Sequence, residues 1–349
     1  MDRVDEVRGR SALRQGIGPT TRRVSSTNLP ALASGVRLGR LNLPVLLMNL
    51  PLSLSTQIPN NVYMEELSPS EREVCLDRAI AQFLPLYRHV AQRAVVYLLP
   101  STPGLQDQTY VSNLGAVLPH CKEDTVVISR FRSSPRVGEE RTGADFFKLM
   151  NFTVERPPET FEGEPVFFEG EADLKHIRGN IYIGAHGMRT SRNTLTWVAE
   201  RFDMEIVPFR IVDRYLYHLD CCVLRITEEA VLLCAAVADQ KSVRAIERQC
   251  EIIDVPLDEA RAGITNSLML PGEILCDSPI DELSKGCPSY SIEKAKLKRL
   301  ENICSRFGRT LHVFCMSEFY KSGALLSCLI MHVNCLADTL RQEHSPNGS

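Results

Sequence analysis

Residues 217–235 read YHLDCCVLRITEEAVLLCA, and they place polar side chains directly before two short apolar runs. The runs at 222–226 and 230–235 have the length of strands and are separated by polar residues, a pattern typical of β-structure. Similar runs recur along the chain between segments with helical patterns, and this alternation predicts an α/β domain. The other expected strands are 45–48, 95–98, 125–129, 180–184 and 310–315, and the expected helices are 71–93, 191–202 and 291–307.

The hydrophobic pattern alone does not separate a doubly wound sheet from a propeller of small α/β units. No near-identical repeat is visible that would decide between them. Ser68 and Ser70, followed by Glu71, predict a polar cap for the first long helix, and Pro85 is expected to interrupt it. The glycines are spaced too irregularly for a phosphate-binding loop, which argues against a dinucleotide or nucleotide enzyme.

The length and composition predict one large folded domain or two small ones, with no affinity for nucleic acid and no membrane span. Of 349 residues, 44% are hydrophobic and 24% are charged, and the net charge of -3 provides no basic field for phosphate backbones. The longest apolar stretch, residues 43–54, contains two prolines and is shorter than the roughly 20 residues of a membrane helix. We expect a flexible tail at 1–35, a catalytic domain at 36–341 and a second tail at 342–349.

The twelve cysteines are scattered, and no two of them form a C-x-x-C pair. Several, such as Cys234 and Cys315, lie within apolar runs. Most are therefore interpreted as small buried hydrophobic residues in a reducing compartment, which predicts a cytoplasmic protein.

Four segments place polar residues beside the expected strands, where catalytic groups are commonly held. Asn61 lies in an Asn-Asn pair, and Asn113 ends the strand-like segment 107–113. Glu169 and Asp173 belong to an acidic segment that follows an apolar run. Paired carboxylates suit a guanidinium cation, because their oxygens match its fork of N–H donors. A turn, a strand end and a solvated loop are the plainer interpretations of these segments.

His218 and Asp220 lie two residues apart, which on a strand would put both side chains on one face. A histidine beside a carboxylate is held in one orientation, and its proton affinity rises. The pair could equally be half of a metal site, but further ligands at a recognisable spacing are missing, so no metal is predicted. Cys328, alone, is one of many apolar-flanked thiols. With an upstream histidine and carboxylates it becomes a candidate nucleophile.

The order of these segments resembles the guanidino-group-modifying superfamily of arginine deiminases, dimethylarginine hydrolases and amidinotransferases. The likeness covers most of residues 45–333 and is strongest to the arginine dihydrolase branch. One departure is the turn before Cys328, which reads Ser-Gly-Ala where the family usually has consecutive glycines. Further segments that carry the resemblance are Tyr110-Val-Ser-Asn-Leu-Gly, Phe131-Arg-x-x-x-Arg and Gly187-Met-Arg-Thr-Ser.

The resemblance implies a five-bladed α/β propeller of ββαβ units around a central polar pocket. It implies that Cys328 attacks the guanidinium carbon and that His218 transfers protons. Glu169 and Asp220 would hold the guanidinium nitrogens, and Asn113 would line the catalytic pocket. No metal and no cofactor would be required.

The resemblance also assigns substrate-binding residues. Arg132 and Arg189 would pair with the substrate carboxylate, while Asn61 and Asp173 would line the same pocket. The expected partner is a small guanidino compound, with arginine as the first choice, and a homo-oligomer stays open. Three alternatives remain: an arginine deiminase, a dimethylarginine hydrolase, and a propeller that binds arginine without turning it over.

Overall fold

Five three-stranded sheets with one shared pairing pattern make up most of the β-structure. In each sheet the central strand pairs antiparallel with one neighbour and parallel with the other. A helix always separates the two parallel strands in sequence, as the long connection between parallel strands requires. The order strand, strand, helix, strand occurs four times along the chain, and the fifth sheet has the same pairing with its antiparallel strand taken from later in the sequence. The computed structural model describes residues 37–334, and the expected tails at 1–35 and 342–349 lie outside this range.

The first unit is completed by a strand from the far end of the described chain, because β17 pairs antiparallel with β1. The sheets, in chain order of their central strands, are β17 (Met331–His332), β1 (Val45–Asn49), β2 (Val95–Leu99); β3 (Gly115–Val117), β4 (Thr125–Ile128), β5 (Thr153–Glu155); β8 (Leu174–Arg178), β9 (Ile181–His186), β10 (Glu205–Arg210); β11 (Val223–Arg225), β12 (Ala230–Leu233), β13 (Glu251–Asp254); and β14 (Leu268–Leu270), β15 (Glu273–Asp277), β16 (Thr310–Phe314).

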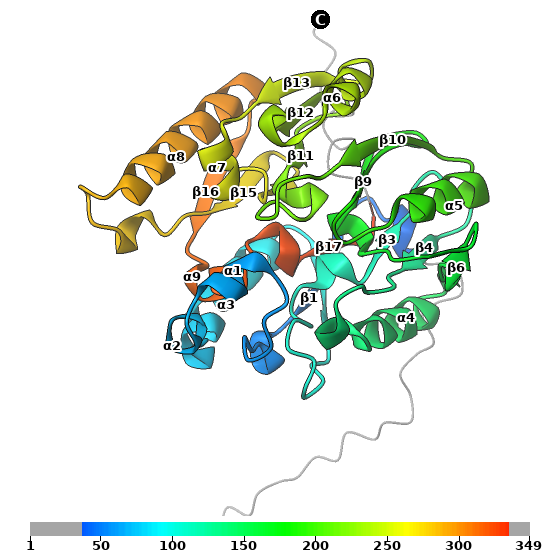
Figure 1. Cartoon of the computed structure of the whole chain (residues 1–349), viewed down its shortest axis with the longest axis horizontal. Helices are drawn as coiled ribbons and strands as arrows, with labels where there is room; N and C mark the ends of the chain where they lie inside the picture. Colours follow the sequence, from blue (N-terminus) through cyan, green and yellow to red (C-terminus); the bar gives the residue numbers. More distant parts are fainter. Residues whose placement is uncertain (1–36, 335–349) are drawn as a thin grey trace, which may run out of the picture. The chain divides into compact units, whose positions relative to one another are not determined.

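The helices that connect the parallel strands lie toward the outside of the described unit, with the strands further in (Figure 1). Apolar side chains of helices and strands form four buried clusters between them. The connecting helices are α3 (Leu76–Ala91), α4 (Glu139–Leu149), α5 (Arg192–Phe202), α6 (Gln240–Glu247) and α8 (Pro288–Phe307). The remaining elements are α1 (Val62–Glu66), α2 (Pro69–Arg72), α7 (Leu257–Arg261), α9 (Ser317–Tyr320) and the hairpin β6 (Thr160–Phe161) and β7 (Glu164–Pro165).

The expected α/β class is confirmed, and each apolar run that was expected to be a strand corresponds to an observed strand. Two expectations for the first long helix were wrong. Pro85 does not interrupt α3, because the helix continues through it with an amphipathic face that packs Phe83 and Leu86 into the core. The cap formed by Ser68 belongs to the separate short helix α2, where it forms a capping box with Glu71.

A short 3-10 helix directly precedes the first strand of several units. These 3-10 helices carry Asn113, Asp220 and Cys328. The 3-10 helix Val111–Asn113 leads into β3, Gly170–Ala172 into β8, Leu219–Cys221 into β11 and Ser327–Leu329 into β17. Strands had been expected at 107–113 and 217–220, and both expectations were wrong, because the backbone turns at these points before the strand begins. Within residues 37–334, none of the helices is long and apolar enough to cross a membrane.

Candidate active site

Cys328 lies in the 3-10 helix before β17, with only 5% of its surface exposed. Its Sγ is 3.7 Å from Asp220 Oδ2, and it accepts a hydrogen bond from Asn266 Nδ2 at 3.4 Å. Burial, together with the nearby charge of Asp220, raises the pKa of the thiol to about 12. The thiol is therefore protonated in the free protein. A cation placed between Sγ and Asp220 would favour the thiolate, which is the nucleophilic form.

His218 is held by Glu169 rather than by the neighbouring Asp220. His218 Nε2 lies 2.8 Å from Glu169 Oε2, and both side chains are buried. The expected pairing of His218 with Asp220 on one strand face is replaced, because Asp220 turns away in the 3-10 helix and accepts a hydrogen bond from Ser327 at 2.9 Å. Glu169 thus fixes the imidazole orientation, as the acidic partner of a general base does.

Glu169 also contacts a guanidinium group within the protein itself. Arg189 Nη1 lies 3.4 Å from both carboxylate oxygens, and the guanidinium lies 4.9 Å from the centre of the Tyr217 ring. Burial alone would raise the pKa of Glu169, but the charges of Arg189 and His218 outweigh it and lower that pKa well below its usual value. The carboxylate is therefore ionised and available to a cation.

One small polar cavity of about 20 Å³ is lined by side chains from several units, among them Cys328, His218, Asn113, Asn61 and Arg189. A volume of this size holds about one water molecule, so that an arginine-sized ligand requires side chains to move. Glu169 and Asp220 lie behind this lining, through their contacts with His218 and Cys328. The structure therefore brings together seven of the nine residues selected from the sequence.

Two asparagines hold parts of the cavity wall in place. The Asn113 amide lies 3.4 Å from His218 Nε2. Asn61 caps α1 by accepting a hydrogen bond from the Met64 backbone N–H, and its Nδ2 donates to the Ser322 carbonyl at 2.8 Å. This second bond ties the N-terminal segment to the turn before Cys328.

Arg132 and Asp173 do not line this cavity. The exposed Arg132 lies against the Phe167 ring, beside a separate surface hollow. Asp173 is buried and uses its oxygens to hold the backbone, accepting hydrogen bonds from the Leu219 N–H at 3.1 Å and from Thr190 Oγ1 at 2.7 Å. These bonds fix the residues that follow His218 and Arg189.

Arg136 occupies the cavity wall where Arg132 had been expected. It forms a buried ion pair with Glu139 at 2.7 Å and donates to the Asp107 and Tyr110 carbonyls. Arg136 stands in the same Phe-Arg-x-x-x-Arg segment as Arg132, so the motif contains the arginine that lines the cavity, although substrate binding had been assigned to Arg132. Asp107, which accepts a hydrogen bond from Asn60 at 2.5 Å, was also missed although it lies in a segment selected from the sequence.

Asn266 was missed entirely. It contacts Cys328 directly, and its Oδ1 accepts a hydrogen bond from the Ser327 backbone N–H at 3.1 Å. Its signal in the sequence is weak: it lies in a polar Thr-Asn-Ser triplet directly before the short apolar run of β14.

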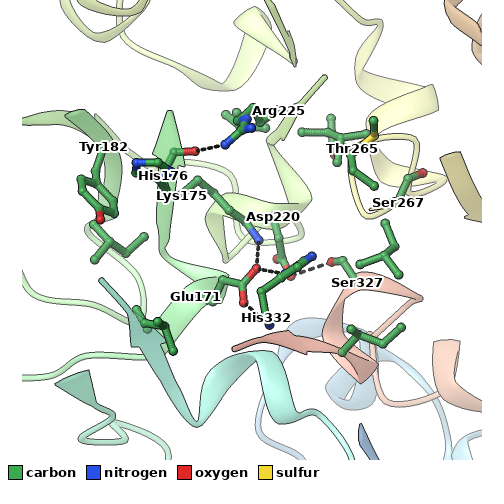
Figure 2. A pocket seen from close by; sticks show the side chains of 18 residues that line it. Glu171, Lys175, His176, Tyr182, Asp220, Arg225, Thr265, Ser267, Ser327 and His332 are labelled. Atoms are coloured by element: carbon green, nitrogen blue, oxygen red, sulfur yellow. Dashed lines mark hydrogen bonds and ion pairs between the residues drawn. The ribbon is translucent and has the colours of Figure 1, made fainter. Parts of the chain in front are cut away.

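A second and larger cavity of about 110 Å³ has mainly apolar walls (Figure 2). Asp220 and Ser327 reach this cavity, but neither Cys328 nor His218 lines it. Figure 2 shows Glu171 beside Lys175 and His332, with His332 Nδ1 2.6 Å from Glu171 Oε1. Because the thiol and the imidazole both face the smaller cavity, the smaller one is the candidate active site.

Solved structures share this arrangement of strands and helices. The product-bound N-terminal domain of ArgZ, an arginine dihydrolase from the ornithine-ammonia cycle in cyanobacteria, has a TM-score of 0.71 and 25% identity, over 83% of this chain and 97% of that chain. A dimethylarginine dimethylaminohydrolase adduct has a TM-score of 0.63 at 15% identity, over 83% of this chain and 99% of that chain. The molecule thus has the mixed α/β fold of guanidino-group-modifying enzymes.

Sequence comparisons give the same result. The bifunctional arginine dihydrolase/ornithine cyclodeaminases AgrE from Nostoc and ArgZ from Synechocystis are each 25% identical over 74% of this chain, which covers 33% of their length. Residues 52–275 match the family described as N,N dimethylarginine dimethylhydrolase, eukaryotic, and the chain belongs to this family. The resemblance seen in the motifs is confirmed, and the chain is related to hydrolases that act on guanidino C–N bonds.

Proposed function

We propose that this chain is a cysteine-dependent arginine dihydrolase, which converts arginine and two water molecules into ornithine, two ammonia and carbon dioxide. One observation carries the proposal: a buried thiol next to Asp220 and an imidazole fixed by Glu169 face the same small cavity. Two of the relatives, AgrE and ArgZ, carry arginine dihydrolase in their names, which supports arginine as the substrate.

The substrate guanidinium takes the place of Arg189 at Glu169. The contact between Arg189 and Glu169 supports this step, because it demonstrates that a guanidinium group fits against the carboxylate. Once displaced, Arg189 is free to pair with the α-carboxylate of the substrate. Arg136, fixed in the cavity wall by Glu139, adds positive charge on that side. In this proposal Arg132 and Asp173 do not touch the substrate.

In the first half-reaction the substrate cation lies between Cys328 and Asp220, and its charge lowers the pKa of the thiol. The thiol proton passes to His218, and the thiolate attacks the guanidinium carbon, forming a C–S bond in a tetrahedral adduct. His218 gives a proton to the departing nitrogen, and the C–N bond breaks to release ammonia. A covalent thiouronium intermediate remains on Cys328.

Hydrolysis of the intermediate by water completes the conversion of arginine to citrulline, and a second cycle then acts on the citrulline. His218 takes a proton from water, whose oxygen attacks the intermediate, and the C–S bond breaks to give the ureido group of citrulline. Cys328 then attacks this ureido carbon as a thiolate, His218 passes the thiol proton to the departing nitrogen, and the C–N bond breaks to release a second ammonia. Water hydrolyses the thioester-like product to a carbamate, which loses carbon dioxide and leaves ornithine.

The five sheets serve in this proposal as the five blades of an α/β propeller, with the active site at its centre. The repeated ββαβ order and the pairing of β17 with β1 support a ring that closes on itself. The proposed catalytic domain spans residues 36–341. A cytoplasmic location and an assembly of identical chains are retained as proposals that rest on the sequence.

The test replaces the nucleophile. Cys328→Ala should reduce ammonia release from arginine by at least about 1000-fold, because no other group supplies the attacking sulfur. Cys250→Ala, which removes a buried thiol from another cluster, is the matched control and should retain activity. Mass spectrometry of quenched wild-type protein should locate an arginine-derived adduct on the Cys328 peptide. Ammonia release by Cys328→Ala at the wild-type rate would refute the proposal.

A further inference from the structure

Three side chains converge at a place that the proposed reaction does not use. His89 lies on α3, Glu273 on β15 and His312 on β16. His89 Nε2 is 2.8 Å from Glu273 Oε2, and His312 Nε2 is 3.5 Å from Glu273 Oε1. The two imidazole rings have their centres 4.3 Å apart. One ligand atom from each residue can be chosen so that all three lie within 4.8 Å of one another.

Two imidazoles and one carboxylate suit first-row divalent transition metals, and zinc is bound by this combination with water in its fourth position. Zinc binds imidazole nitrogen at about 2.0–2.1 Å, so its ligand atoms stand somewhat more than 3 Å apart (about 3.3–3.5 Å in a tetrahedral site). The observed separations require only small shifts of the side chains. Magnesium and calcium demand mainly oxygen ligands and do not suit this set.

The ligand atoms are only partly used by the protein. His312 Nε2 is buried and, among the described residues, makes no hydrogen bond. Arg93 Nε lies 2.7 Å from each oxygen of the Glu273 carboxylate and orients it, and each of these oxygens also lies near one imidazole nitrogen.

We propose that His89, Glu273 and His312 bind one zinc ion, with water completing the coordination. The ion connects α3, the helix of the first ββαβ unit, to the sheet of the last unit, β14-β15-β16. The site is structural and independent of the Cys328 chemistry. Its ligands are widely separated in sequence, which explains why no ligand spacing was visible there.

The test measures zinc binding in a Cys328→Ser background, since the active-site thiol and imidazole are themselves zinc ligands. Calorimetry should detect a zinc site that raises the melting temperature. Adding His312→Ala should weaken this binding by at least about tenfold. His186→Ala, which removes a histidine at the end of β9, is the matched control and should not weaken it. Magnesium at the same concentration should not change the melting temperature.

The visible absorption spectrum of the protein with Co²⁺ in place of zinc identifies the metal ligands. Co²⁺ in the Cys328→Ser protein should show visible d–d bands without the thiolate charge-transfer band, and His312→Ala should remove those d–d bands. His312→Gln serves as the second variant if His312→Ala does not fold, which circular dichroism without metal decides. Zinc binding that is equally tight with either His312 variant, or a thiolate band in the cobalt spectrum, would overturn the proposal.

Discussion

At the scale of single residues, the proposed nucleophile Cys328 is a neutral thiol in the free protein, and the proposed reaction requires its thiolate. Burial raises the pKa of Cys328 to about 12, and two contacts act on it. Asp220 disfavours the thiolate, whereas the Asn266 amide favours it by donating a hydrogen bond. In the proposed mechanism, a substrate cation offsets the effect of Asp220 on the pKa of the thiol, because the carboxylate then holds the cation beside the sulfur. Substrate binding and thiol activation are thereby coupled.

Asn266→Leu is expected to lower kcat/KM by about tenfold to a hundredfold, because a hydrogen bond to a charged sulfur is lost. The variant also raises the pKa of Cys328, so the alkylation of the thiol by iodoacetamide should shift to higher pH. Alkylation followed over a pH series measures this shift. Reduced turnover with an unchanged alkylation profile would contradict the role given to Asn266 and indicate a general loss of structure.

Asn113 is expected to decide where the reaction stops. An ionised aspartate only accepts hydrogen bonds and suits a guanidinium cation, whereas an amide can donate to the carbonyl oxygen of the neutral ureido group. Asn113→Asp should therefore release citrulline, with one ammonia for each arginine instead of two. Amino-acid analysis measures the ratio of citrulline to ornithine. Ornithine as the main product of this variant would show that the amide does not hold the intermediate.

At the scale of elements, several site residues lie just before the first strand of a ββαβ unit, and the sequence indicated only some of them. Asn113, Asp220, Asn266 and Cys328 each lie two or three residues before the first strand of a unit. A polar residue just before a short apolar run was the available signal, and it identified the residues that also belong to family-like motifs. Asn266 had no such motif. Arg132 was chosen over Arg136 because spacing alone does not tell which arginine turns inward.

The turn before Cys328 depends on Gly323, whose φ is +74° and whose added Cβ would lie 2.8 Å from the Tyr63 ring. Gly323→Ala should therefore lose about 1–3 kcal/mol through overpacking, in addition to about 1–2 kcal/mol of backbone strain. Gly163→Ala is the matched control, because Gly163 has a φ of +80° and no neighbour within 4 Å. Urea unfolding measures both variants. Equal losses would contradict the clash with Tyr63.

At the scale of the whole molecule, the sequence predicted the α/β class and most central strands but not how they are grouped. The pairing of β17 with β1 joins residues from opposite ends of the described chain, and local hydrophobic patterns contain no information about such contacts. Several strands and the helices α4 and α6 were also missed. β8 has only two apolar residues, Leu174 and Ile177, which do not alternate with polar ones, and α6 is short and mostly polar. The expectation of a propeller came from the family resemblance and not from the hydrophobic periodicity.

The central claim is that the whole chain turns arginine into ornithine, and product analysis tests it most directly. Purified protein is incubated with arginine, and ammonia, citrulline and ornithine are measured over time. The account predicts ornithine with two ammonia for each arginine consumed, and no lasting accumulation of citrulline. Stoichiometric citrulline with one ammonia would contradict the dihydrolase proposal in favour of a deiminase, and unchanged arginine would contradict arginine hydrolysis altogether.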